Sequence, residues 1–117
     1  MCGIAGILTK RENKKEIIEA MSERIKHRGP DGVGYFFDGD LALCHRRLSI
    51  IDLSTGNQPM FNEDATIVTV FNGEIYNYIE LKEELEKLGH IFKTKSDTEV
   101  LVHGYEEWYT DLPKHLR

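Results

Sequence analysis

The chain contains 117 residues, of which 40% are hydrophobic, and it carries a formal net charge of −5 at pH 7. This length and composition predict one soluble globular domain with a single core. The mild charge, with basic residues scattered among acidic ones, argues against a nucleic-acid-binding or membrane-binding face. The apolar runs are too short to span a bilayer, and no signal peptide is recognisable. Two cysteines without secretory context favour free thiols in a reducing cytoplasm.

The first half of the chain predicts a strand, a helix and a hairpin in that order. Residues 2–8 are a short apolar run typical of a strand. Residues 13–26 place isoleucine and methionine side chains on one helical stripe, with charged side chains around the other side. Two strands follow at 33–38 and 41–48, and the Asp-Gly-Asp sequence between them is a strong hairpin signal. The second of these strands delivers Arg47 near its end.

After a loop, residues 66–71 form a β-branched run that predicts a largely buried strand. This strand stops at Asn72 and Gly73. A helix is then expected to begin at Asn77, because asparagine at the cap with a glutamate three residues later is similar to a capping box. Leucines form one stripe along this helix, and a glycine ends it.

Residues 91–94 predict another short strand. Ser96 with Glu99 then repeats the cap signature and opens the last helix, which places Asp97 in its first turn. The order is strand, helix, hairpin, strand, helix, strand and helix. This order predicts an α+β chain.

Six short motifs occur in order along the chain: Cys2-Gly-Ile-Ala-Gly, His27-Arg-Gly-Pro-Asp-Gly, Arg47-Leu-Ser-Ile-Ile-Asp, Asn57-Gln-Pro-Met, Phe71-Asn-Gly-Glu-Ile-Tyr-Asn and Ser96-Asp-Thr-Glu. This set resembles the glutaminase domain of class II glutamine amidotransferases, and within that group the glutamine-hydrolysing asparagine synthetases. The resemblance runs from Cys2 to about Trp108. It implies the N-terminal-nucleophile hydrolase fold, a sandwich of sheets between helix layers (αββα). In that family further strands follow, so residues 1–117 are expected to be an incomplete glutaminase domain without the synthetase domain.

Cys2 is the first candidate for chemistry. Once an aminopeptidase removes Met1, Cys2 carries both a thiol and a free α-amino group, and at neutral pH such an amine can accept a thiol's proton. Nucleophile and base then lie on one residue, as they do in enzymes with an N-terminal threonine. The alternative is an initiator methionine followed by a buried cysteine, which the Met-Cys pair alone favours. The ordered motifs shift the interpretation to a nucleophile.

Attack on a carboxamide places negative charge on its oxygen, which requires hydrogen-bond donors. The side-chain amide of Asn72 and the backbone N–H of Gly73 fit that need, because a loop just after a strand lets the backbone approach closely. An ordinary Asn-Gly turn is the alternative for any isolated pair of this kind. The surrounding motif favours an oxyanion hole.

A bound glutamine zwitterion calls for a guanidinium and a carboxylate, and the resemblance assigns these roles to Arg47 and Asp97. Arginine binds a carboxylate through two parallel hydrogen bonds, which lysine cannot provide. A surface arginine and an aspartate at a helix start are the ordinary alternatives. The resemblance also implies that the glutamine pocket is lined by Glu74 and by backbone groups of Leu48, Ser49, Ile50 and Ile51.

Several other residues receive structural interpretations. Cys44 lies in the middle of an apolar strand and is expected to be a core thiol. Arg46 should point to the face opposite Arg47 and be a surface or structural residue. The five histidines have no spacing typical of zinc, so no metal is expected. Arg28 is expected to order a loop near the mouth of the site.

The resemblance implies that the chain hydrolyses L-glutamine to glutamate and ammonia through a Cys2 thioester. The ammonia would pass to a synthetase domain or subunit that binds ATP with Mg²⁺ and activates aspartate, so no cofactor is expected in these residues. The acceptor stays open, with asparagine synthesis as the default, and a homodimer is also left open. Two alternatives are a shortened or engineered module for binding or regulation, and a related hydrolase of an unrelated amide that needs no clamp.

Overall fold

The computed structural model describes residues 1–49 and 56–117, and the chain divides into two compact units. The first unit contains the described residues up to position 49, together with 57–59 and 70–72. The second unit contains Gly56, residues 60–69 and residues 73–117. Each unit combines helices with a small antiparallel sheet, which confirms the predicted α+β class. No helix within these ranges is long and apolar enough to cross a membrane.

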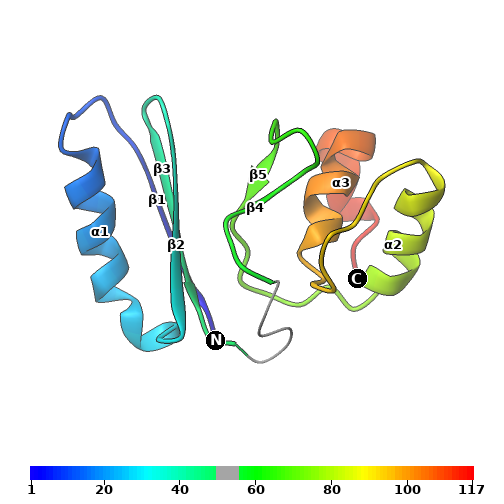
Figure 1. Cartoon of the computed structure of the whole chain (residues 1–117), viewed down its shortest axis with the longest axis horizontal. Coiled ribbons are helices and arrows are strands. Elements are labelled where there is room, and N and C mark those ends of the chain that lie inside the picture. Colours follow the sequence, from blue (N-terminus) through cyan, green and yellow to red (C-terminus); the bar gives the residue numbers. More distant parts are fainter. Residues whose placement is uncertain (50–55) are drawn as a thin grey trace. The chain divides into compact units, whose positions relative to one another are not determined.

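The first unit is a three-stranded antiparallel sheet with one helix against it (Figure 1). The strand order is β1-β3-β2, so the hairpin strands are neighbours and the first strand pairs with the second arm of the hairpin. The hairpin turns through Gly39, which has a φ of +51° that a glycine adopts without strain. The elements are β1 (Gly3–Leu8), α1 (Lys14–Arg24), a 3₁₀ turn (Lys26–Arg28), β2 (Gly32–Asp38) and β3 (Leu41–Arg47).

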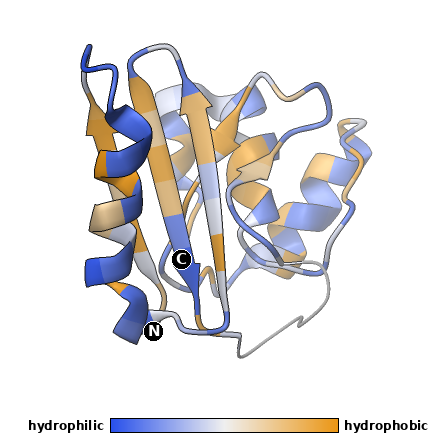
Figure 2. Cartoon of the chain, turned by 60° about the vertical axis from the view of Figure 1, so that its left-hand side comes forward, coloured by the Kyte–Doolittle hydropathy of each residue, from blue (hydrophilic) through white to orange (hydrophobic). Residues whose placement is uncertain are grey.

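The core of this unit lies between α1 and one face of the sheet. Ile18 of the helix and Ala42 and Cys44 of β3 are fully buried there, and Met21 and Tyr35 pack against them. Cys44 is therefore the core thiol that the sequence predicts. Toward its end β3 changes from hydrophobic to hydrophilic residues (Figure 2). The apolar part of this strand holds the fold, and its polar end carries candidate site residues.

The second unit packs two helices with a two-stranded antiparallel sheet. Its apolar core includes Leu81 and Leu85 from the first helix and Val100 and Val102 from the second. The predicted leucine stripe is confirmed except at Leu88, which is 54% exposed. The elements are β4 (Met60–Phe61), β5 (Val68–Thr69), α2 (Tyr78–Lys87), α3 (Glu99–Trp108) and a 3₁₀ segment (Tyr109–Lys114).

Two predicted strands are wrong or too long. The β-branched run at 66–71 contains only the two-residue strand β5, and its residues from 67 onward are half-buried rather than buried. No strand forms at 91–94. The Glu99 carboxylate accepts hydrogen bonds from the backbone N–H groups of Lys93 and Thr94, both at 2.7 Å. Because the Glu99 side chain accepts hydrogen bonds from these two N–H groups, they need no partner strand.

The two predicted helix caps also differ from the structure. Asn77 is the residue before α2, but its side chain makes no cap hydrogen bond. Its side chain instead donates to the carbonyl of His115 at 2.8 Å and accepts from the N–H of Arg117 at 2.9 Å. The residue before α3 is Thr98 rather than Ser96, so Asp97 lies in the turn that precedes the helix. Long-range contacts have replaced local capping at Asn77. The Ser96 hydroxyl still accepts a local hydrogen bond, from the N–H of Thr98 at 3.3 Å.

Candidate glutaminase site

The Cys2 thiol lies beside the backbone of Leu48, just past the end of β3. The N–H of Leu48 donates to Cys2 Sγ at 3.3 Å, and the Leu48 carbonyl lies 3.7 Å from the same sulfur. Strand pairing explains this placement, because Gly3 pairs with Arg46, so the antiparallel register brings Cys2 opposite Arg47 and next to Leu48. Cys2 is half-buried, whereas Met1 is 73% exposed. The sulfur is fixed while the residue in front of it is open to an aminopeptidase.

Arg28 holds the backbone of the same residue. Its Nε donates to the carbonyl oxygen of Cys2 at 3.1 Å. Gly29 follows, at a point where a Cβ atom would lie 2.3 Å from the backbone of Arg46. Only glycine fits such a close approach. Arg28 therefore anchors the N-terminal residue, which is a more specific role than the loop ordering that the sequence predicts.

Arg46 and Arg47 point to opposite faces of the sheet, as strand geometry predicts. Arg46 is buried against α1, where its Nε donates to the Ser22 hydroxyl at 2.7 Å and its Nη2 pairs with Glu23. It is a structural residue and is not on the surface. Arg47 is 8% exposed, and its Nη1 donates to the side-chain oxygen of Asn57 at 2.8 Å. Asn57 thus helps to orient the guanidinium that is expected to bind the substrate carboxylate.

The position of Asn72 is set by contacts to the residue before it. The Phe71 carbonyl accepts a hydrogen bond from His45 Nε2 at 3.2 Å, and the Phe71 N–H donates to Gln58 Oε1 at 2.6 Å. Burial lowers the pKa of His45, and the charge of Arg47 lowers it further, against the hydrogen bond to Phe71. Of the two neutral tautomers, the one with its proton on Nε2 can donate to this carbonyl. Both contacts hold the chain immediately before the predicted oxyanion donor.

Gly34 allows the loop at 57–59 to lie against β2. A Cβ atom at this position would fall 1.9 Å from the carbonyl oxygen of Gln58. Any side chain here would displace the loop that carries Asn57 and Gln58. The Asn57-Gln-Pro-Met motif therefore positions Arg47 and the chain at Phe71. The sequence identified this motif without predicting its role.

In the second unit, Asp97 lies beside the segment that follows Asn72. Its Oδ2 accepts a hydrogen bond from the N–H of Ile75 at 2.8 Å. Gly73 and Glu74, which precede Ile75, are exposed. The carboxylate predicted to bind the substrate ammonium is therefore fixed next to two other predicted site residues.

The remaining predicted pocket residues fall on the chain after Leu48. The N–H of Ser49 donates to Asp31 Oδ2 at 2.8 Å, so that backbone donor is already engaged. Asp31 belongs to the His27-Arg-Gly-Pro-Asp motif, which thus reaches the same region from another part of the sequence. Ile50 and Ile51 lie outside the described residues.

A separate group of four side chains in the second unit could hold a metal ion: Glu63, His90, His103 and Glu106. Burial opposes ionisation of Glu63, but the N–H of Ile91 and the rings of His103 and His90 lower its pKa to about 2. Sequence spacing did not reveal this group, because its members come from three separate segments. The His103 and Glu106 pair, three residues apart on α3, was the one available signal.

Comparison with known proteins identifies the family. The model of the glutamine amidotransferase domain matches residues 1–117. The chain is 48% identical to an asparagine synthetase (glutamine-hydrolysing) of Bacillus subtilis, over 100% of this chain and 19% of that protein. It is 46% identical to one of Arabidopsis thaliana, over 96% of this chain and 19% of that protein. The chain thus spans about a fifth of the length of these relatives. It belongs to the glutamine amidotransferase domain family.

Proposed function

We propose that this chain hydrolyses L-glutamine to L-glutamate and ammonia, with Cys2 as the nucleophile. The observation that carries the proposal is the thiol of Cys2, which is held by the Leu48 N–H at 3.3 Å within a chain of this family. A backbone donor aimed at sulfur favours the thiolate, which is the nucleophilic form. Removal of the exposed Met1 supplies the α-amino base on the same residue.

The reaction proceeds in two halves. The α-amine of Cys2 takes the thiol proton, the sulfur attacks the side-chain carbonyl carbon of glutamine, and the C–N bond breaks. The departing nitrogen receives the proton from the ammonium and leaves as ammonia, and a glutamyl thioester remains. Water activated by the same amine then hydrolyses the thioester to glutamate and restores the thiol. Arg28 serves both halves because it holds the Cys2 carbonyl.

Asn72 and Gly73 supply the donors for the oxygen that becomes negative during both attacks. The hydrogen bonds to Phe71 from His45 and Gln58 support this assignment, because they fix the chain just before Asn72. Donors fixed in advance cost no reorganisation during the reaction. One such donor is ordinarily worth about 2.7–4 kcal/mol of the barrier.

Arg47 binds the α-carboxylate of glutamine, and Asp97 binds its α-ammonium. Support for the first assignment is the buried guanidinium oriented by Asn57, and support for the second is the carboxylate fixed by Ile75 beside Glu74. Recognition of both ends of the zwitterion selects glutamine over simple amides. Glu74 and the backbone of Leu48, Ser49, Ile50 and Ile51 complete the pocket in this proposal.

The ammonia is consumed in an ATP-dependent amidation. The relatives are named glutamine-hydrolysing asparagine synthetases, so aspartate is the proposed acceptor. A synthetase domain or subunit would bind ATP with Mg²⁺, and this chain would supply only the nitrogen. We also infer that the units belong to the sandwich of sheets between helix layers typical of N-terminal-nucleophile hydrolases, in a cytoplasmic enzyme. The helix on one face of the β1-β3-β2 sheet is consistent with one half of that architecture.

The test is ammonia release measured with L-glutamine, D-glutamine and a simple primary amide as substrates. The proposal predicts release from L-glutamine alone by protein whose intact mass lacks Met1. Equal release from all three amides would favour a hydrolase of another specificity. An inert protein that is folded and lacks Met1 would favour a non-catalytic module. The family match and the names of the relatives favour the enzyme.

A further inference from the structure

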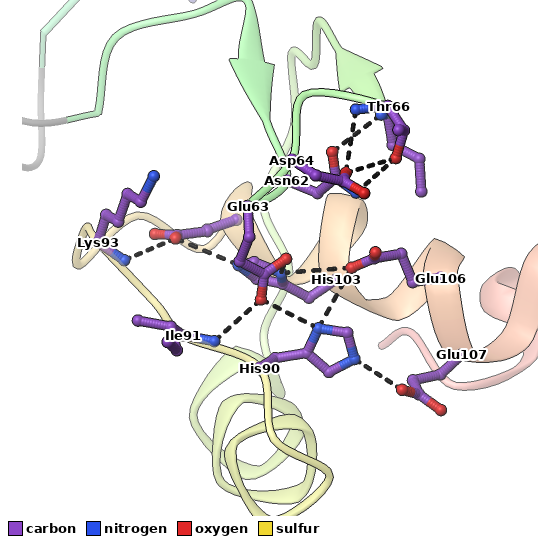
Figure 3. Close-up of polar contacts among 12 residues, drawn as sticks. Asn62, Glu63, Asp64, Thr66, His90, Ile91, Lys93, His103, Glu106 and Glu107 are labelled. Carbon is purple, nitrogen blue, oxygen red and sulfur yellow. Dashed lines mark hydrogen bonds and ion pairs between the residues drawn. The ribbon is translucent and has the colours of Figure 1, made fainter.

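Four polar side chains converge in the second unit, and none of them is assigned to glutamine (Figure 3). Glu63 comes from the turn between β4 and β5, and His90 from the chain just after α2. His103 and Glu106 lie one turn apart on α3. One ligand atom from each residue lies within 4.8 Å of the others. Three segments distant in sequence therefore bring two imidazoles and two carboxylates to one point.

The separations suit a small metal ion. His90 Nδ1 lies 3.3 Å from Glu63 Oε1 and 3.3 Å from Glu106 Oε2. His103 Nδ1 lies 3.2 Å from Glu63 Oε2 and 3.9 Å from Glu106 Oε2. Ligands about 2.1 Å from a tetrahedral Zn²⁺ ion lie about 3.4 Å from one another. The four side chains already stand near the spacing that such an ion requires.

Carboxylates outside the group lie against the outer nitrogen of both rings. His90 Nε2 lies 2.7 Å from Glu107 Oε1, and His103 Nε2 lies 3.3 Å from Glu99 Oε1. A carboxylate accepts hydrogen bonds, so each Nε2 is placed to carry a proton, and a ring that loses its Nδ1 proton then turns a lone pair toward Glu63 and Glu106. Histidines that bind metals characteristically donate their other N–H to a carboxylate in this way. Both rings are thus arranged as metal ligands.

Two of the inward-facing atoms in this part of the structure lack a hydrogen-bond partner, whereas His90 Nδ1 and Glu63 Oε1 lie at hydrogen-bond distance, 3.3 Å apart. Among residues 1–49 and 56–117, the buried His103 Nδ1 and Glu106 Oε2 make no hydrogen bond. The His103 side chain is 1% exposed, so water does not reach this nitrogen freely. Unless each Nδ1 is protonated, its lone pair faces carboxylates and is repelled by them, and a cation between these groups would relieve the repulsion. One divalent ion would satisfy all four groups together and balance the two carboxylate charges.

We propose that Glu63, His90, His103 and Glu106 form a binding site for a divalent transition-metal ion of the zinc class. Imidazole ligands favour zinc and its neighbours over Mg²⁺ and Ca²⁺, which prefer oxygen alone. Four protein ligands make a closed site, which is typical of a structural ion rather than a catalytic one. The ion joins the β4–β5 turn, the chain after α2 and helix α3, so it stabilises the unit that carries Asp97.

The test uses the purified protein as a Cys2→Ser variant, so that the Cys2 thiol does not bind metal. After treatment with a chelator and removal of the chelator, the protein is titrated with ZnCl₂ by calorimetry and with CoCl₂ by visible spectroscopy. We expect one Zn²⁺ per chain, a rise in Tm with zinc, and the intense visible absorption of tetrahedral cobalt. None of these readouts depends on glutamine hydrolysis.

Matched variants locate the site. Glu106→Gln and His90→Gln each remove one ligand and should abolish the cobalt spectrum, whereas Glu84→Gln, an exposed carboxylate on α2, should leave it unchanged. Glu107→Gln keeps all four ligands but loosens His90, and it should weaken zinc binding about 10-fold to 100-fold. Circular dichroism checks that each variant is folded.

Three results would overturn the proposal. The first is no zinc binding and no change in Tm for the Cys2→Ser protein. The second is equal zinc binding by the Glu106→Gln, His90→Gln and Glu84→Gln variants, which would place the metal elsewhere. The third is ¹⁵N spectra in which both His90 and His103 are doubly protonated at neutral pH and unchanged by zinc. In that case protons alone would hold the group together.

Discussion

The two faces of strand β3 have different roles. One face packs in the core, and the other carries candidate site residues. On the face toward α1, Ala42 and Cys44 are fully buried in the core and Arg46 is bound by Ser22 and Glu23. On the opposite face, His45 and Arg47 meet loop segments instead of a helix. These segments are 57–59 and 70–72, and their contacts orient a guanidinium and the chain before Asn72.

Side-chain chemistry alone therefore does not separate structural from functional residues. Two arginines stand next to each other, and both are buried. The two arginines differ in their partners. Ser22 fixes Arg46 against α1, whereas Asn57 orients the guanidinium of Arg47. The two cysteines differ in the same way, because Cys44 is packed against Ile18 whereas Cys2 is held by one backbone N–H. Each of the following substitutions tests either a core residue or a candidate site residue.

The largest effect is expected at the cysteines. Cys2→Ala should abolish ammonia release from glutamine, because no thioester can form, while glutamine binding is largely retained. Cys44→Ala should keep turnover and cost about 1 kcal/mol of unfolding free energy. Ammonia assays and urea unfolding of both variants measure this. Loss of turnover in a folded Cys44→Ala protein together with activity in Cys2→Ala would reverse the assignment.

Asn72→Ala should have the next largest effect. Loss of one oxyanion donor is expected to lower kcat by about 10²–10³-fold, with little change in glutamine binding, because the donor acts mainly on the transition state. Single-turnover kinetics with a separate binding measurement would separate the two quantities. A variant that binds glutamine and turns it over at the original rate would exclude Asn72 from the oxyanion hole.

Arg47→Lys keeps the charge but removes the fork of parallel donors. Lysine cannot make two parallel hydrogen bonds to the substrate carboxylate, so the glutamine KM should rise strongly. A displacement of the amide from Cys2 of about 1 Å can also lower the rate on the order of 10²-fold. Steady-state kinetics on folded protein measures both effects. Unchanged kcat and KM would mean that another cation binds the carboxylate.

Arg46→Lys is the matched change on the other face of β3. It should leave the glutamine KM near its original value, because Arg46 faces α1. It should cost about 1–3 kcal/mol of unfolding free energy, because the hydrogen bonds to buried Ser22 are lost. Urea unfolding compared with kinetics tests this. A raised KM without loss of stability would mean that Arg46 contributes to glutamine binding rather than to the core.

The smallest effect concerns His45 and pH. Its folded-state pKa lies below the ordinary value near 6.5, so the unfolded chain binds more protons as the pH falls. The unfolding free energy should therefore decrease from about pH 6.5 downward, until the pH passes the folded-state pKa. His45→Gln keeps a donor for the Phe71 carbonyl and should weaken this pH dependence. Identical pH profiles of the two proteins would show that His45 does not titrate as described.

Local patterns in the sequence predicted much of the first unit. The apolar run of β1, the stripe of α1 and the Asp-Gly-Asp turn each depend on neighbouring residues, and the structure confirms all three. Prediction was weaker where a distant group competes for the backbone. Glu99 binds the N–H groups of Lys93 and Thr94, and Asn77 binds the chain at His115 and Arg117, so neither a strand nor a cap forms.

The candidate site shows the same limit. Cys2, Arg47, Asn72, Gly73 and Asp97 were identifiable because each lies in a recognisable motif. The contacts that position them were not, because Asn57 reaches Arg47 across a loop and Gln58 reaches Phe71 through the fold. The group of Glu63, His90, His103 and Glu106 escaped prediction for the same reason. No fixed spacing along the chain relates residues that meet only after folding.

The mass of the acyl-enzyme tests most directly whether Cys2 is the nucleophile. Protein mixed with L-glutamine and quenched in acid within one turnover is digested, and the peptides are analysed by mass spectrometry. We expect a glutamyl adduct on the N-terminal peptide, attached to Cys2 and found only in molecules that lack Met1. An adduct on Cys44, or turnover by protein that retains Met1, would contradict this expectation.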